Sequence, residues 1–135
     1  MAPASSFRVI PLYRQVEVRD AAPDAADVDR PQWESGDEPV LASAQCIVLA
    51  TRSDLHGPVE IEVWVDASEH RPAGHLLFEG ELLTTGEGAA VGNPLAGDLH
   101  RVPLPIGWHP VRIYGDQPRD PARFLVVFDG TPAPT

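Results

Sequence analysis

Lysine is missing from this sequence. All ten basic residues are arginine, and they stand against twenty acidic residues, for a formal net charge of −10. A protein that binds duplex nucleic acid needs a basic face that displaces counterions from the phosphates. The charge balance therefore argues against nucleic acid as a partner.

Cysteine is nearly absent as well. Cys46 is the only cysteine, so no internal disulfide can form. Its setting, AQCIVLAT, is apolar and lacks a nearby basic residue that would stabilise a thiolate. We therefore interpret Cys46 as a small buried hydrophobic residue and not as a nucleophile.

Long apolar runs are also missing. No stretch reaches the roughly 18 apolar residues that a membrane-spanning helix requires. The N-terminal residues, MAPASSFRVIP, have neither the basic region nor the continuous apolar core of a signal peptide. We expect a soluble cytoplasmic protein with no membrane partner. Its 135 residues fit one domain over residues 1–135, with a C-terminal tail over 130–135.

Short segments with strand character fill most of the chain. Valines alternate with charged residues in 11–19 and again in 59–66, and in the first segment Glu17 and Arg19 occupy the polar side. Glycine- and proline-rich turn signals separate the segments, among them GEGAAVGNPLAG. The other expected strands are 44–52, 75–85, 99–104, 109–115 and 123–129.

About seven strands without a convincing amphipathic helix predict an all-β fold. We expect an antiparallel β-sandwich or a small jelly-roll-like barrel, with at most a short helix within residues 20–40. In PLPIGWH, residues 103–109, the two prolines and Gly107 predict a turn that starts a strand. Pro110 inside that strand predicts an edge strand or a bulged one.

Acidic residues concentrate in 20–40, where seven carboxylates and one arginine give a local charge of −6. Three prolines and the lack of a strand period predict a loop, and a loop this long is usually functional or disordered. It is either a solvated connector or a binding loop that presents carboxylates to a basic protein partner. The partner-facing candidates in it are Asp24, Asp27, Asp29, Glu34 and Glu38.

Trp64 is a further partner-facing candidate. It falls on the polar side of its strand, beside Glu60, Glu62 and Asp66. Either a second layer covers this side or the indole is exposed, and an exposed tryptophan flanked by carboxylates would suit an interface.

A metal site is the main enzymatic alternative. His75, Glu79 and the downstream His109 resemble the spacing of the two cupin motifs, which would hold iron or manganese in a jelly roll. Ala73 stands where the first motif has its other histidine, and the second motif needs one more residue between Gly107 and His109. We therefore expect no metal and no cofactor. No other catalytic motif occurs, so we assign no catalytic residues.

The run RVPLPIGWHPVRIYG, followed by DQPRDPARFLVVF, resembles the C-terminal half of a family of small bacterial all-β proteins. Some of these proteins are similar in outline to competence-J-type nuclease inhibitors and to immunity proteins. The resemblance brings no catalytic residues with it. It implies a non-catalytic protein-binding module, such as an inhibitor or an immunity-like protein. A homo-oligomeric structural protein that pairs through a sheet edge is the third hypothesis.

Overall fold

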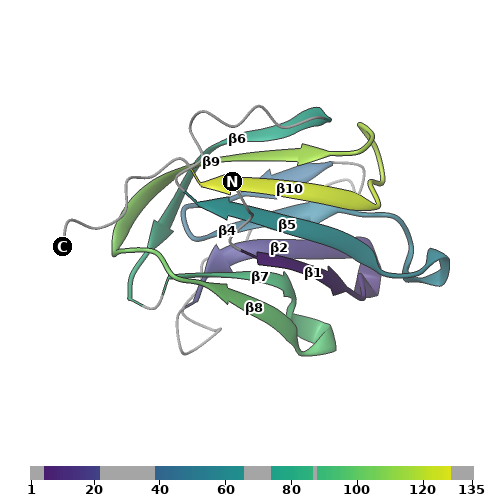
Figure 1. Cartoon of the computed structure of the whole chain (residues 1–135), viewed down its shortest axis with the longest axis horizontal. Coiled ribbons are helices and arrows are strands. Elements are labelled where there is room, and N and C mark those ends of the chain that lie inside the picture. Colours follow the sequence, from purple (N-terminus) through teal and green to yellow (C-terminus); the bar gives the residue numbers. More distant parts are fainter. Residues whose placement is uncertain (1–4, 22–38, 66–73, 87, 129–135) are drawn as a thin grey trace.

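The protein is an all-β sandwich of two five-stranded sheets (Figure 1). The computed structural model describes residues 5–21, 39–65, 74–86 and 88–128. Sheet A has the strand order β1-β5-β10-β9-β6, and sheet B has the order β3-β4-β2-β7-β8. The strands are β1 (Ser5–Val9), β2 (Gln15–Asp20), β3 (Val40–Ala42), β4 (Cys46–Ala50), β5 (Val59–Val65), β6 (His75–Thr84), β7 (Ala89–Asn93), β8 (Asp98–Val102), β9 (Gly107–Gly115) and β10 (Arg123–Phe128).

The expected all-β sandwich is confirmed, with ten strands where the sequence predicted about seven. The pairing is mostly antiparallel, but β10 runs parallel to β5. The remaining regular elements of the described residues are three short 3₁₀ turns, η1 (Leu12–Arg14), η3 (Asp54–His56) and η4 (Pro94–Ala96). Within the described ranges, no helix has the length and apolar character needed to cross a membrane.

Three strands, β1, β3 and β7, were not predicted from the sequence, and β7 is the most informative of them. It lies inside the stretch that was interpreted as a turn, GEGAAVGNPLAG. Gly92, in β7, has a φ of +145°, and a Cβ placed on it would lie 2.0 Å from the carbonyl oxygen of Asp98 in β8. Here glycine permits a close strand pairing and does not mark a turn.

The hydrophobic core lies between the two sheets, where the inward side chains of both meet. Alternation along β5 and β9 directs Val59, Ile61, Val111 and Ile113 into it. Contacts between the sheets close both lateral edges of the sandwich. At one edge the rings of Phe7 and His100 stack with centroids 3.8 Å apart, and at the other the Leu83 N–H donates to the Ala44 carbonyl.

The side of β2 that faces away from sheet A is buried too. Glu17 is 0% exposed and Arg19 4% exposed, although alternation placed both on the polar side. Arg19 Nη1 lies 3.3 Å from Glu17 Oε1, and the Cys46 thiol donates to the same oxygen over 3.5 Å. Cys46 is therefore buried, as its sequence setting predicted, but against a carboxylate.

The PLPIGWH segment is a turn that starts β9, as predicted. Gly107 has a φ of +134°, and the Pro105 carbonyl accepts hydrogen bonds from Thr84 Oγ1 (2.7 Å) and His109 Nε2 (2.6 Å). Pro110 was predicted to mark an edge strand or a bulged one. The first alternative is wrong, because β9 lies between β6 and β10, and the bulge in the described β6–β9 pairing lies at Leu77 of β6. Among the described residues, the pairing with β10 reaches Val111, which lies opposite Phe128, and Pro110 pairs with Glu81 of β6.

The acidic connection leaves β2 and enters β3. Both strands run antiparallel to β4, which lies between them, so they point in the same direction. Ala21, hydrogen-bonded to Gly88, and Pro39, hydrogen-bonded to Ala50, therefore lie at opposite ends of sheet B. Residues 22–38, the short helix expected there and the tail over 130–135 lie outside the described residues.

Candidate functional site

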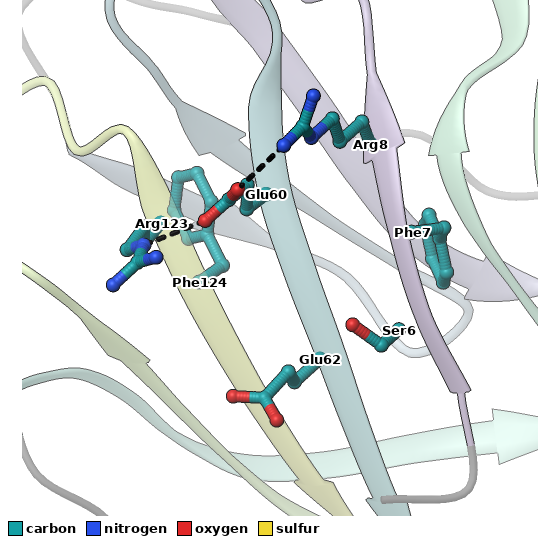
Figure 2. Close-up of a pocket in the computed structure, with 7 residues that line it drawn as sticks. All are labelled: Ser6, Phe7, Arg8, Glu60, Glu62, Arg123 and Phe124. Carbon is teal, nitrogen blue, oxygen red and sulfur yellow. Dashed lines mark hydrogen bonds and ion pairs between the residues drawn. The ribbon is translucent and has the colours of Figure 1, made fainter.

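A shallow polar groove crosses the outer face of sheet A where β1, β5 and β10 lie side by side (Figure 2). Strand register places its central charges. Arg8 of β1 and Arg123 of β10 both lie opposite Glu60 of β5, one on each side. The groove is lined by Ser6, Phe7, Arg8, Glu60, Glu62, Arg123 and Phe124.

Glu60 is the centre of an ion network in this groove. Its Oε2 accepts from Arg123 Nε over 2.6 Å, and its Oε1 lies 3.5 Å from Arg8 Nη2 (Figure 2). The hydrogen bond and charge of Arg123, with a smaller contribution from Arg8, hold the pKa of Glu60 below its ordinary value. Glu60 in turn raises the pKa of Arg123. We interpret the network as a cross-strand tie on the sheet surface.

Replacing Glu60 with glutamine is expected to lower stability slightly near neutral pH, because solvent reaches all three side chains and weakens their ion pairs. Because the pKa of the Glu60 carboxyl is lower in the folded state, its ionisation stabilises the fold at pH values above its pKa in the unfolded chain. That contribution is lost as pH falls through the folded pKa. Urea unfolding in low salt should thus separate the wild type from Glu60→Gln at about pH 7, and the difference should shrink as the pH falls through the folded pKa of Glu60. Glu62→Gln, on the same face, is the control, and a Glu60→Gln deficit that persists in acid would contradict the assignment.

The predicted partner-facing carboxylates cannot be placed. Asp24, Asp27, Asp29, Glu34 and Glu38 all lie outside the described residues. Their part in binding a partner therefore stays a prediction. What the structure does describe is the start of their segment. Asp20 accepts hydrogen bonds from Thr85 Oγ1 (2.6 Å) and Gln45 Nε2 (3.1 Å), which fixes the point where the segment leaves sheet B.

Trp64 lies on the outer face of sheet A, as alternation predicted, but its indole is covered. It is 8% exposed and packs with Val127, against which Tyr114 and Leu125 also lie. Trp64 is thus not an exposed tryptophan flanked by carboxylates. A role for it in partner binding stays a prediction, and burial restricts any such role to supporting its neighbours.

The three residues of the cupin-like alternative do not converge. A bulge at Leu77 shifts the register of β6, so His75 lies opposite Gly115 while Glu79 lies opposite Arg112, on the other face of the sheet. His109 points into the core. In the described part of the chain, no three potential ligands are grouped closely enough to hold a metal ion. The hypothesis of a shared site for His75, Glu79 and His109 is therefore wrong, because one inserted residue inverts the alternation.

The exposed tryptophan of the described residues is Trp108, at 55% exposure. It lies near the start of β9, opposite Leu83 of β6, on the outer face of sheet A. Trp108 was not predicted from the sequence to be a binding residue. The signal was present, because Trp108 has the same parity as Arg112 and Tyr114 and the opposite parity to the buried Val111.

A second exposed apolar group lies at the other end of the sandwich, which carries the β4–β5 and β9–β10 connections (Figure 1, right). Tyr13 is 81% exposed and Leu55 91% exposed. Tyr13, Arg14 and Asp120 have positive φ angles, and Arg14 pairs with Asp120 over 3.1 Å. Backbone strain of this kind persists only where the surroundings hold it. We call this the loop end, defined by Tyr13, Arg14, Leu55 and Asp120.

Comparison with known proteins gives a likeness of fold. No family model matches the chain, and a search of curated proteins finds no match. Among solved structures the chain is similar to ComJ from Bacillus subtilis, an inhibitor of the DNA degrading activity of NucA. The TM-score is 0.70 at 12% sequence identity, over 93% of this chain and 95% of ComJ. The resemblance to competence-J-type inhibitors is confirmed, and the chain has the fold of ComJ over nearly its whole length.

Proposed function

We propose that this protein is a non-catalytic inhibitor that binds a basic enzyme partner. The observation that supports the proposal most is the likeness in fold to a nuclease inhibitor over 93% of the chain. The net charge of −10 supports the character of the partner. An enzyme that degrades DNA binds a polyanion and offers it a basic surface, which an acidic inhibitor complements.

In this proposal the acidic connection attracts the partner. More than half of the net charge lies in residues 20–40. Charges of one sign in one region raise the rate of encounter with an oppositely charged protein, and salt screens this effect. The carboxylates of Asp24, Asp27, Asp29, Glu34 and Glu38 therefore contribute chiefly to the association rate.

The function is tested with the purified, tagged chain and an extract of its source organism. Cleavage of labelled DNA is followed with and without the chain, and proteins retained by the tag are identified, purified and tested again alone. We expect DNA degradation to fall and the responsible nuclease to be retained. Undiminished degradation, with no nuclease retained, would refute the proposed function.

Neutralising Asp24, Asp27, Asp29 and Glu38 to their amides is expected to slow association with that nuclease about severalfold at low salt. The sequence predicts a loop here, so each substitution should change the free energy of unfolding by no more than about 0.5 kcal/mol. Binding rates at two ionic strengths measure the effect. Asp54→Asn, in η3, is the single-charge control. If the variant and the wild type show equal rates and equal salt dependence, residues 20–40 are a solvated connector and not a binding loop.

A further inference from the structure

We infer that the partner docks on one particular surface of sheet A, which we call the β6–β9 face. Trp108 is its apolar anchor, and Glu79 and Glu81 receive basic side chains of the partner. The inference rests on the proposed function and adds to it the site of contact. The face consists of Leu76, Glu79, Glu81, Leu83, Trp108 and Pro110.

Strand register pairs residues of β6 with residues of β9 across this face. Leu83 lies opposite Trp108, and Glu81 lies opposite Pro110. Directly opposed side chains on one face of an antiparallel pair lie about 5 Å apart, and diagonal ones within reach of a long side chain. The Trp108 indole therefore lies beside an apolar side chain and within reach of a carboxylate.

The apolar part of the face is exposed without a structural reason. Trp108 is 55% exposed and Leu76 53% exposed, whereas Trp64 on the same sheet is buried. Tryptophan is the residue type most enriched among those that dominate binding energy at protein interfaces. Trp108 lies on β9, which pairs with β6, and the next residue, His109, donates a hydrogen bond to the Pro105 carbonyl. Little further ordering of this strand is therefore needed when a partner binds.

The charged part of the face has more acidic than basic side chains. Glu79 and Glu81 are exposed, and neither forms an ion pair with any described residue, in contrast to Glu60, which has two arginines. Arg112 lies opposite Glu79, but its guanidinium donates to the Tyr114 hydroxyl over 3.0 Å. Carboxylates beside an indole suit arginine or lysine, because the ring face also attracts a cation. Charge complementarity thus favours a basic protein. A second copy of this chain would place like charges against each other.

The loop end fits a basic partner less well. Its Arg14 is already paired with Asp120, and although Asp54 is next to the exposed Leu55, neither of the described tryptophans, Trp64 and Trp108, lies there. Because the loop end lies at the opposite end of β9 from Trp108, removing an exposed apolar side chain there is a control for the β6–β9 face. Leu55→Ala removes an apolar side chain that is more exposed than Leu76.

The experiment uses the nuclease purified in the test of the proposed function and measures its association and dissociation rates with each variant. Trp108→Ala is expected to weaken binding about tenfold or more, mostly through faster dissociation, with Trp108→Phe in between. The double variant Glu79→Gln with Glu81→Gln should bind more slowly and show a weaker salt dependence. Leu55→Ala should bind like the wild type. In the complex, acrylamide should quench the fluorescence of Trp108 less than it does in the free protein.

Circular dichroism and melting temperature check that each variant is folded. We expect all of them to fold, because the substituted side chains are exposed. If the wild type binds the nuclease and both Trp108→Ala and the double glutamine variant bind equally well, this inference is wrong while the proposed function stands. Weakening by Leu55→Ala alone would place the contact at the loop end and likewise overturn it. If the wild type neither binds nor inhibits, both proposals fall. Self-association of the wild type that Trp108→Ala abolishes would assign the face to a second copy and refute the basic partner.

Discussion

Replacing Gly92 with alanine is expected to lower the free energy of unfolding by about 3 kcal/mol or more, through backbone strain and a backbone clash together. The Gly92 φ of +145° is rarely adopted by residues with a side chain. A Cβ would also lie 2.0 Å from the Asp98 carbonyl oxygen and 3.3 Å from the Leu99 Cα. Both contacts are to backbone, so β7 and β8 have to separate.

Chemical denaturation followed by circular dichroism measures this loss. Gly86→Ala is the matched control, because the space around Gly86 is open and its φ lies outside the left-handed range. That control should stay within about 0.5 kcal/mol of the wild type. A Gly92→Ala variant as stable as Gly86→Ala would mean that β7 and β8 do not approach each other as the structure describes.

Removing either partner of the Glu17–Arg19 pair is expected to cost about 3–5 kcal/mol, because the remaining buried charge loses the ion pair between them. Both side chains are almost fully buried, and the Cys46 thiol also donates to Glu17. The single variants are Glu17→Leu and Arg19→Met. The double variant should recover most of the loss, since apolar residues of similar volume often replace a buried ion pair at little cost.

The exposed pair of Arg8 and Glu60 supplies the comparison, with the same two residue types in water. Urea unfolding of the three β2 variants and of Arg8→Met completes the series. We expect Arg8→Met to be nearly neutral. If Glu17→Leu proved as mild as Arg8→Met, the outer side of β2 would have to be open to solvent.

Alternation along a strand was enough to assign several side chains to a face. The valines of 59–66 were predicted to share a side, and they point into the core. Val111 and Ile113 of β9 follow the same alternation. Pleating alone sends successive side chains to opposite faces, whatever the rest of the fold is. The positive φ of Gly107 and the burial of Cys46 followed in the same way from local chemistry.

The local pattern failed where one residue changed the register or where glycine had a long-range role. The bulge at Leu77 separated His75 from Glu79, which simple alternation had placed together. Gly92 was interpreted as a turn residue because its neighbour, Asp98, comes close only once β7 and β8 pair. Neither fact can be read from the residues of one strand.

Exposure of the outer faces was decided by the tertiary structure alone. Alternation predicted correctly that Glu17 and Trp64 face away from the core. For Trp64 it left open whether a second layer covers that side or the indole is exposed. Both are buried, while Trp108, on the same face of sheet A as Trp64, is exposed. The strand period determines direction, since it is a property of the backbone. Burial depends on which distant segments pack above each residue, and no local period carries that information.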